Sequence, residues 1–257
     1  MSNVHGLLSS TLMVAEPAHH SSLTESVHVW PVRLIASTST TEILASYLDD
    51  VEHARAARIR VDDGRRRFVL GRGALRLMAS RCLKRRPSEV VFTYGAHGKP
   101  ALADSNVCFN YSASGDLAMM AFCIGSDVGI DVEEVRAIDQ PLDIAARYFH
   151  PLEVRELAGT SAAERNVAFL RLWTCKEAVV KAVGLGLSLA LDSFCLTGVL
   201  SGNARLADLP GGTVGAEWEV RDLSLPRDYI AALAYRRPGR TVAREPVRTL
   251  DELNPEP

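Results

Sequence analysis

Apolar residues recur along the chain with two periods, one typical of long amphipathic helices and one typical of short strands. Residues 64–84 carry apolar side chains at helical spacing, and two aspartates just before them favour a helix start. A second long helix is predicted from Ser161 to Val183, because Gly184 is suited to end it. Shorter helices are predicted at 40–48 and at 141–149. Another follows the first and ends at about residue 58, and a further one starts at residue 151. Strands are predicted at 27–35, 90–94, 107–112, 117–124, 128–133, 193–197, 216–223 and 229–235.

The order of these elements predicts an α+β fold made of two similar halves. A long helix followed by about three strands occurs twice, and short turns between strands favour antiparallel sheets. Pro31 indicates that the first strand lies at a sheet edge, where a missing N–H is tolerated. We expect a disordered extension at 1–26, an N-terminal half at 27–126, a C-terminal half at 127–236 and a flexible tail at 237–257. A site between the halves would take side chains from both.

Composition narrows the functional classes. The 257 residues are 47% hydrophobic with a formal net charge of -2, so the molecule as a whole is not an electrostatic binder of nucleic acid. No apolar run approaches the roughly 20 residues that span a bilayer, so no membrane partner is expected. The five cysteines form no CxxC pair, which indicates reduced, buried thiols in a cytoplasmic protein and argues against a zinc site.

Lysine is scarce in this chain. Of the 29 basic residues only four are lysines, namely Lys84, Lys99, Lys176 and Lys181. Arginine therefore solvates most of the surface, which indicates that lysine is kept for its compact ammonium group. Three of the four lysines lie in the segments described next.

The first candidate segment is the strand sequence Gly129-Ile-Asp-Val-Glu133. Asp131 and Glu133 are two residues apart, so on a strand both carboxylates point to the same face. A divalent cation that prefers hard oxygen ligands, such as Mg²⁺, would relieve the repulsion between them. A DxE pattern alone leaves the alternative of an ordinary solvated strand face open.

The second segment is the helical sequence WTCKEAVVKAVG, which starts at Trp173. Glu177 and Lys181 lie four residues apart and share a helix face with Trp173, one turn earlier. A surface salt bridge would also explain the pair. Against that alternative, two of the scarce lysines fall among apolar residues here, and Glu177 could complete a three-carboxylate magnesium site with Asp131 and Glu133.

The third segment comprises GAHGKP at 95–100 and FNYSASG at 109–115. Its glycines allow the backbone to approach a ligand closely, Lys99 adds a cation, and Ser112 and Ser114 offer hydroxyl groups. The pattern favours a phosphate-binding loop, although it lacks the GxxxxGK[ST] signature of a P-loop. Taken alone, a turn rich in Gly, Lys and Pro is more often a surface connection.

Together and in this order, the segments resemble the motifs of the 4′-phosphopantetheinyl transferase superfamily, specifically its surfactin-synthetase-activating (Sfp-type) branch. The family motifs GKP, FNxSHSG, G(I/V)DxE and W(T/S)xKExxxK correspond here to GKP at 98–100, FNYSASG at 109–115, GIDVE at 129–133 and WTCKEAVVK at 173–181. The resemblance covers about residues 27–236. It implies a pseudo-twofold pair of α+β halves in one chain, with coenzyme A bound between them.

The resemblance implies a role for each matching residue. Asp131, Glu133 and Glu177 would hold Mg²⁺, with Mn²⁺ as an alternative, and the ion would bridge the pyrophosphate of coenzyme A. Lys181 would stabilise charge on the leaving 3′,5′-ADP.

The resemblance also implies how the substrate is held. Lys99, with Gly98 and Pro100, would bind the nucleotide end, Ser112 would bind a phosphate, and Arg55 would contact the 3′-phosphate.

The implied reaction moves the phosphopantetheine arm of coenzyme A to a serine of an apo acyl or peptidyl carrier protein. Asp131, Glu177 and Lys181 are the expected catalytic residues. Glu177, acting directly or through a water, is the expected base, and a lysine is the alternative. The carrier should be a small acidic helical domain that docks on the stretch after Gly184 and on residues 150–156. We expect the enzyme to be a monomer.

One position departs from the family pattern. The histidine that usually follows the serine of FNxS is Ala113 here, which removes a contact to the coenzyme A phosphate. We expect His97, next to GKP, or an arginine to replace that contact. Two other functions remain as alternatives at this point: a non-catalytic homologue that binds coenzyme A or a carrier, and a metal-dependent phosphodiesterase.

Overall fold

A computed structural model describes residues 20–207, 209–210, 214–223, 225–226, 228–253 and 255. Of the disordered extension expected at 1–26, residues 1–19 lie outside the described residues. Residues 20–25 form a short helix and residue 26 begins a strand. Within the described residues, no helix combines the length and the apolar character needed to cross a membrane.

The long helices end close to where local chemistry predicts, whereas the second begins at Arg165 and not at Ser161, because residues 162–164 form a turn first. The helices are α1 (His20–Glu25), α2 (Thr38–Ser46), α3 (Asp50–Arg58), α4 (Asp62–Leu83), α5 (Pro141–Tyr148), α6 (Pro151–Ala158) and α7 (Arg165–Val183). Helix α4 carries Asp62 and Asp63 in its first turn, where carboxylates suit the helix dipole. Helix α7 ends at Gly184, which has the left-handed φ of +81° that glycine adopts without strain.

Short 3₁₀ turns and strands complete the chain. The 3₁₀ turns are η1 (Pro87–Glu89), η2 (Gly186–Ser188), η3 (Leu191–Ser193), η4 (Gly215–Glu217) and η5 (Asp251–Leu253). The strands are β1 (Ser26–Arg33), β2 (Phe92–Tyr94), β3 (Pro100–Leu102), β4 (Val107–Ser114), β5 (Leu117–Ile124), β6 (Val128–Glu134), β7 (Leu196–Thr197), β8 (Arg205–Leu206), β9 (Trp218–Leu223), β10 (Tyr229–Arg236), β11 (Thr241–Arg244) and β12 (Arg248–Thr249). The strand expected at 193–197 is shorter than predicted, because residues 191–193 form η3 instead.

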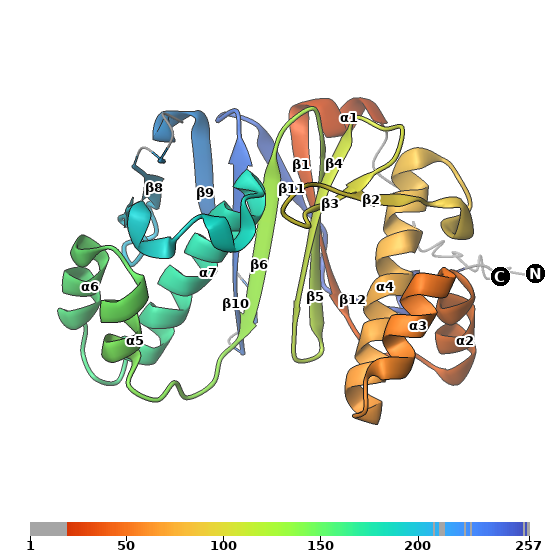
Figure 1. The fold of residues 1–257 in the computed structure, drawn as a ribbon, viewed down its shortest axis with the longest axis horizontal. Coiled ribbons are helices and arrows are strands. Elements are labelled where there is room, and N and C mark those ends of the chain that lie inside the picture. Colours follow the sequence, from red (N-terminus) through yellow and green to blue (C-terminus); the bar gives the residue numbers. More distant parts are fainter. Residues whose placement is uncertain are drawn as a thin grey trace, which may run out of the picture.

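The α+β fold is confirmed, and its two halves share one strand order. In the first sheet β5 lies between β1 and β4, and in the second sheet β10 lies between β6 and β9. All of these pairings are antiparallel. Figure 1 shows α4, with α2 and α3, on one side of the strands and α7, with α5 and α6, on the other. Each half therefore places one long helix against the outer face of a three-strand unit.

Three apolar clusters hold these layers together. One joins α4 to the first sheet and includes Leu75 and Phe122, and a second joins α7 to the second sheet and includes Leu172 and Ala232. The third lies between the two sheets and contains Met119 from β5 among its fully buried side chains. The sheets thus pack face to face inside two outer helical layers, an arrangement that excludes water from both faces of each sheet.

Gly129 on β6 sets the distance between the second sheet and α7. A Cβ atom at this position would overlap the carbonyl oxygen of Ala178 and the amide nitrogen of Ala182, both on α7. Only glycine allows β6 to approach the helix this closely. The close approach brings Asp131, two residues along β6, beside the last turns of α7.

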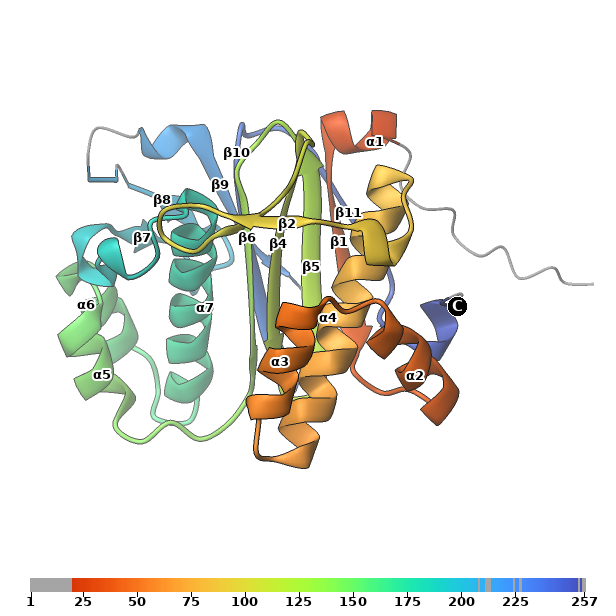
Figure 2. The same ribbon diagram turned by 45° about the vertical axis from the view of Figure 1, so that its right-hand side comes forward.

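A two-stranded ribbon of β2 and β3 connects the halves on one face. It crosses in front of the gap between α4 and α7 (Figure 2). Its turn carries His97, whose carbonyl oxygen would lie 3.5 Å from a Cβ atom at Gly186 in the other half. Of these two strands, only β2 falls within a strand predicted from the sequence, at 90–94, whereas β3 was not predicted.

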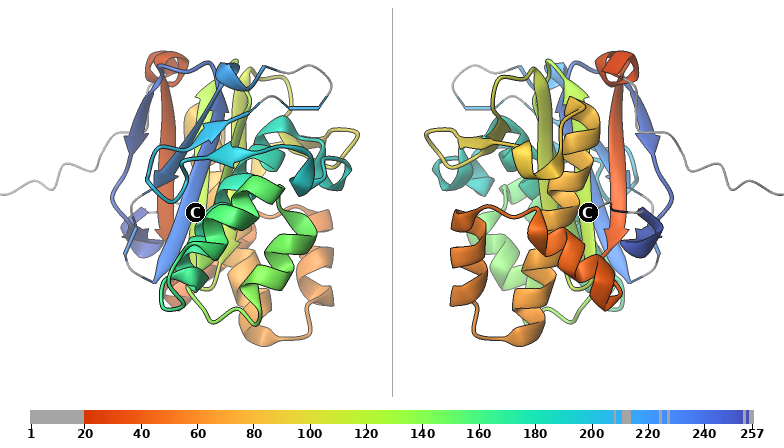
Figure 3. Two further views of the ribbon diagram at one scale, coloured as in Figure 1. Left: turned by 90° about the vertical axis from the view of Figure 1, so that its left-hand side faces the viewer. Right: turned by 90° about the vertical axis from the view of Figure 1, so that its right-hand side faces the viewer.

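The segment at 237–257, expected to be a flexible tail, contains two strands that pair with the first sheet. Strands β11 and β12 pair in parallel with β1, so β1 is an internal strand and not the sheet edge that Pro31 suggested. Pro31 lies between the part of β1 that pairs with β11 and the part that pairs with β12. No neighbouring strand therefore loses a hydrogen bond because proline has no N–H. Figure 3 shows these blue strands running beside the red β1.

Buried leucines anchor this segment. Leu250 and Leu253 are 0% and 3% exposed and pack in the cluster beneath α4. Arg240 donates to the carbonyl oxygen of Ile124 at 3.0 Å, which ties the start of the segment to β5. The segment is therefore part of the N-terminal half, although it follows the C-terminal half in sequence.

This packing predicts the effect of truncating Leu250. The Leu250→Ala variant should lower the free energy of unfolding by about 2–5 kcal/mol, the range for removing a buried leucine side chain. Urea denaturation would measure the change, with Leu187→Ala as a matched control because Leu187 is fully exposed. Equal free energies of unfolding for the two variants would show that Leu250 does not pack against the N-terminal half.

Candidate active site between the two halves

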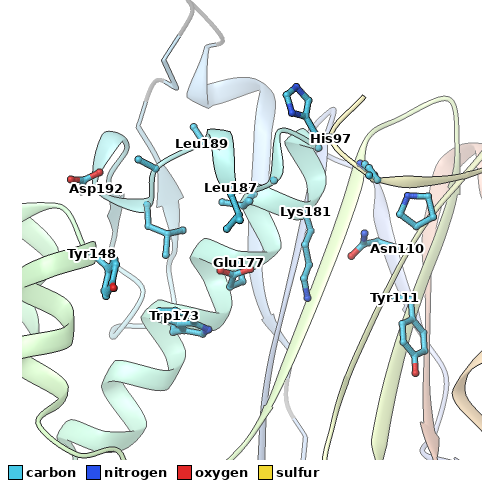
Figure 4. A pocket seen from close by; sticks show the side chains of 18 of the residues that line it. His97, Asn110, Tyr111, Tyr148, Trp173, Glu177, Lys181, Leu187, Leu189 and Asp192 are labelled. Atoms are coloured by element: carbon cyan, nitrogen blue, oxygen red, sulfur yellow. The ribbon is translucent and has the colours of Figure 1, made fainter. Parts of the chain in front are cut away.

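A pocket of about 750 Å³ opens between the two halves. Its walls come from α4, β4 and the turn before β3 in the first half, and from α5, α7 and the stretch after α7 in the second. Figure 4 shows Glu177 and Lys181 on successive turns of α7, with Trp173 one turn earlier and Asn110 facing them across the pocket. This arrangement agrees with the expected site between the halves.

Below the pocket, three side chains form a closed hydrogen-bonded triangle. The Lys181 ammonium donates to Asp131 Oδ1 at 2.6 Å and to Ser112 Oγ at 2.9 Å. The Ser112 hydroxyl donates to the same Asp131 oxygen at 2.8 Å. The triangle joins α7, β6 and β4, so it connects α7 to both sheets.

Side chains from β4 continue this connection along β6. Asn110, Ser112 and Ser114 occupy alternate positions of β4 and therefore share a face. Asn110 Oδ1 accepts from the amide of Ile130 at 2.9 Å, and Ser114 Oγ accepts from the amide of Glu134 at 3.0 Å. The polar positions of FNYSAS thus act as a side-chain ladder between the two halves.

Asp131 is a buried carboxylate that relies on a cation. It is 4% exposed, and burial raises its pKa above the usual range, while Lys181 and Ser112 act in the opposite direction. Its second oxygen, Oδ2, is buried and has no hydrogen-bond partner among the described residues. An unpaired buried oxygen costs free energy, so this atom is suited to a ligand that brings positive charge.

Glu177 lies half-buried in the pocket wall on α7. Burial raises its pKa first, repulsion from Asp131 raises it further, and Lys181 lowers it. The carboxyl group is thus held close to a second negative charge, and its proton is bound more tightly than in an ordinary glutamate.

Glu133 is held apart from this pair. Its Oε2 accepts from Ser114 Oγ at 3.3 Å and forms an ion pair with Arg136 at 2.9 Å. Within the described ranges, no three His, Cys, Asp or Glu side chains lie close enough to share a metal ion. The three expected ligands therefore do not converge here, because Lys181 and Arg136 neutralise two of the carboxylates separately.

Lys99 does not present its ammonium group to the pocket as expected. Its side chain lies against Gly184, and its Nζ donates to the carbonyl oxygens of Ala182 at 2.6 Å and Val128 at 3.3 Å. Burial lowers its pKa. The lysine of GKP thus binds one carbonyl in the last turn of α7, a favourable position for a cation, and one carbonyl at the start of β6. Gly98, Lys99 and Pro100 all line the pocket, although the Lys99 ammonium group is held by these carbonyls.

Two other expected ligands lie outside the pocket wall. Ser112 is 7% exposed and sits below the pocket floor, in the triangle with Lys181. Arg55 is exposed on α3, where its guanidinium lies 5.2 Å from the centre of the Phe68 ring. Arg55 is not among the described residues that line the pocket.

A fully buried ion pair orients α7. Lys176 donates to Glu153 Oε1 at 2.6 Å and to the carbonyl oxygen of Phe194 at 2.9 Å, and both charged side chains are 0% exposed. Glu153 also accepts from the amides of His150 and Leu196. The pair therefore joins α6, α7 and the chain after η3, and it fixes the rotation of α7 that points Glu177 and Lys181 at the pocket.

Sequence reasoning missed much of the pocket wall. Arg72, Tyr111 and Tyr148 line it, and so do leucines after α7 such as Leu187 and Leu191. Tyr111 occupies the variable position of FNxS and so lies inside a recognised motif, whereas Tyr148 lies in the predicted helix at 141–149, outside the four family motifs. No pattern within one element shows that distant apolar residues meet at a common wall.

Comparison with known proteins places these residues in a family context. The family model described as "4'-phosphopantetheinyl transferase superfamily" matches residues 127–234. The 4′-phosphopantetheinyl transferase HetI of Nostoc sp. is 33% identical over 223 residues, covering 85% of this chain and 91% of its own.

Two Bacillus proteins are similar at the same level. The 4′-phosphopantetheinyl transferase psf-1 of Bacillus pumilus is 32% identical, covering 77% of this chain and 83% of its own. The 4′-phosphopantetheinyl transferase Sfp of Bacillus subtilis is 32% identical, covering 62% of this chain and 70% of its own. The similarity to HetI extends through both halves of the fold, beyond the region that the family model matches.

The raised pKa of Glu177 predicts a pH-dependent stability in metal-free protein. Because the folded state holds this proton more tightly than the unfolded state, stability is highest below the ordinary glutamate pKa and falls as pH rises through the raised one. Urea denaturation at several pH values should show this fall for the wild type. The Glu177→Gln variant should show a smaller fall, and parallel curves would contradict the assignment.

Proposed function

Because the chain belongs to the 4′-phosphopantetheinyl transferase superfamily, we propose that it transfers the 4′-phosphopantetheine arm of coenzyme A to a serine of an apo carrier protein, using Mg²⁺ and releasing 3′,5′-ADP. The observation that best supports this proposal is the inter-half pocket in which Glu177 and Lys181 stand over the buried Asp131. Phosphoryl transfer needs little more from a protein than positioning and neutralisation of charge.

The residues fit a divalent cation by their chemistry. Asp131 keeps one buried oxygen without a partner, and Asp131 and Glu177 repel each other, so both gain from a nearby positive charge. We propose Asp131, Glu133 and Glu177 as the ligands, with Mn²⁺ as a substitute metal. Their convergence on one ion would require Asp131 to release Lys181 and Glu133 to release Arg136. When bound, the cation would supply charge neutralisation to the pyrophosphate of coenzyme A.

The remaining chemistry falls to Glu177 and Lys181. The carrier serine loses its proton to Glu177, and its oxygen forms a bond to the phosphorus that carries the pantetheine arm. The bond from that phosphorus to the bridging oxygen breaks, and the electron pair leaves with 3′,5′-ADP. Lys181 Nζ, already in the pocket wall, donates hydrogen bonds to the phosphate oxygens as negative charge develops on the leaving group.

The turn at 95–100 is the proposed site of the nucleotide end of coenzyme A. Residues 97–100 all line the pocket, and the ammonium group of Lys99 holds the turn in place through its bonds to the carbonyl oxygens of Ala182 and Val128. We propose that Arg55 contacts the 3′-phosphate and that Ser112 contacts a phosphate. Each contact would require the side chain to leave its present partner, the Phe68 ring for Arg55 and Asp131 for Ser112.

The proposed carrier surface lies beside the pocket entrance. Leu187 is fully exposed and Leu152 and Tyr148 are partly exposed, although all three are apolar or aromatic. Tyr148 and Leu187 also line the pocket, and exposed apolar residues at a pocket mouth suit a partner that delivers its serine there. An acidic acyl or peptidyl carrier domain is the proposed partner. We also propose that the enzyme is a cytoplasmic monomer, because one chain supplies every described wall of the pocket.

A carrier-labelling assay tests the proposal. Incubation of the protein with coenzyme A, Mg²⁺ and an apo carrier should increase the carrier mass by one phosphopantetheine group. The Glu177→Gln variant should lower kcat by about 100-fold or more, because it removes the proposed base and a metal ligand. Chelation of divalent cations should abolish the transfer in the wild type.

The control for this assay is Glu42→Gln, which changes an exposed glutamate on α2 far from the pocket. It should leave kcat unchanged. Cleavage of coenzyme A at the same rate without a carrier would instead indicate a phosphodiesterase, and a carrier of unchanged mass would indicate a binding protein.

His97 is the proposed replacement for the family histidine, because Ala113 is exposed on β4 whereas His97 lines the pocket. His97→Ala should raise the KM for coenzyme A by roughly tenfold with little change in kcat, as expected for the loss of one hydrogen bond to a charged group. Adding Ala113→His to that variant should restore part of the loss. His53→Ala, on the exposed face of α3, is the control, and an unchanged KM in His97→Ala would exclude the role.

A further inference from the structure

Two cysteines that the proposed reaction does not use stand directly opposite each other. Cys108 on β4 and Cys123 on β5 are register partners in the antiparallel pair. Both side chains belong to the cluster between the sheets, in which Cys123 is fully buried and Cys108 is half-buried. The remaining three cysteines are also free thiols and lie on other elements.

The strand register places the Cα atoms of these two cysteines within the range that a disulfide spans, and a small local shift of the strands would bring their Cβ atoms to the usual separation of about 3.5–4.5 Å. The amide of Gly125 donates to the carbonyl oxygen of Asn106 at 3.1 Å, which makes this opposite pair a hydrogen-bonded one. Because such pairs alternate along an antiparallel ladder, Cys108 and Cys123 also occupy a hydrogen-bonded position, where the Cα atoms lie about 5.5 Å apart. Disulfides are found at Cα separations of about 4.4–6.8 Å.

Only one of the two thiols is open to solvent. Cys108 lines a second hollow of about 660 Å³, whose wall also includes Ser126 and Asp127. Burial raises the pKa of Cys123 to about 12, so this thiol is protonated and shielded from solvent oxidants, and it can react only with a neighbouring group that takes its proton, such as a sulfenic oxygen on Cys108. A solvent oxidant therefore reaches Cys108 first, and Cys123 is placed to resolve the product.

We propose that Cys108 and Cys123 form a reversible redox site that closes to a cross-strand disulfide in the presence of a peroxide. Cys108 sulfur attacks the peroxide oxygen and becomes a sulfenic acid, and water or an alcohol leaves. Cys123 sulfur then attacks the Cys108 sulfur, the S–S bond forms, and the sulfenic oxygen leaves as water with the Cys123 proton. Two thiols and one peroxide thus yield one disulfide, and a dithiol reductant reverses the change.

The cysteine pair lies next to the residues that align the two halves. The Cys123 thiol donates to the carbonyl oxygen of Ser126 at 3.2 Å, in the turn that leads into β6. Lys99, which binds the carbonyl of Val128 two residues later, interacts electrostatically with both cysteines. Disulfide formation turns Cys123 away from Ser126 and so disturbs the start of β6, the strand that carries Asp131.

The expected consequence rests on the proposed transferase function. The oxidised enzyme should show a value of kcat/KM for coenzyme A lower by about fivefold or more, a typical coupling between distinct sites. Reduction with dithiothreitol should restore it. The covalent change itself can be measured without any activity, so its failure is distinguishable from failure of the proposed function.

The test treats the full chain with hydrogen peroxide at increasing doses and maps the products by mass spectrometry after blocking the remaining thiols. We expect the loss of two hydrogen atoms and a peptide in which Cys108 is bonded to Cys123. Cys108→Ser should abolish both this bond and the loss of activity, and Cys123→Ala serves as a second variant. Cys82→Ala, on α4, should still form the bond and is the matched control.

Three outcomes would overturn the proposal. The first is an absence of the Cys108–Cys123 peptide at every dose, and the second is oxidation of Cys108 alone to a sulfinic acid. The third, a disulfide that forms without any change in kcat/KM, would overturn the link to the active site.

Discussion

The structure depends on one buried negative charge that three elements share. Asp131 lies where β6, β4 and α7 meet, and Lys181 and Ser112 both bond to its Oδ1. A buried carboxylate without a partner costs several kcal/mol, so these elements must keep their relative positions to avoid that cost. The close approach at Gly129 and the buried Lys176–Glu153 pair are what make the geometry possible, because they set the distance and the rotation of α7.

The two halves meet through side chains at this point and not through a backbone ladder. Strands β4 and β6 belong to different sheets, and the polar row of β4 supplies the bonds that a ladder would otherwise make. A joint of this kind leaves room for a pocket above it, since strands paired along their full length would close the space. The polar residues of FNYSAS therefore support the active site from below, and the turn that contains Lys99 supports it from the side.

Features within a single element could be predicted from sequence, and features between elements could not. Helical period and Gly184 located the body and the end of α7, and the two-residue spacing predicted that Asp131 and Glu133 lie on one face of the strand at 128–133. The direction of Lys99 was missed because its partners are main-chain carbonyls, which no residue pattern marks. The C-terminal strands were missed because a segment rich in Pro, Arg and Glu has no apolar alternation. Parallel pairing with β1 and two buried leucines hold it in place instead.

The balance of charge explains why the site needs another cation to work as proposed. Asp131, Glu133 and Glu177 carry three negative charges when ionised, whereas Lys181 and Arg136 supply two positive ones. A diphosphate ester entering the pocket adds further negative charge beside Lys181, and one ammonium group cannot neutralise both the buried carboxylate and the substrate. Asp131 can release Lys181 to the phosphates only if another cation takes its place. The unpartnered Oδ2 of Asp131 is the atom at which that exchange would begin.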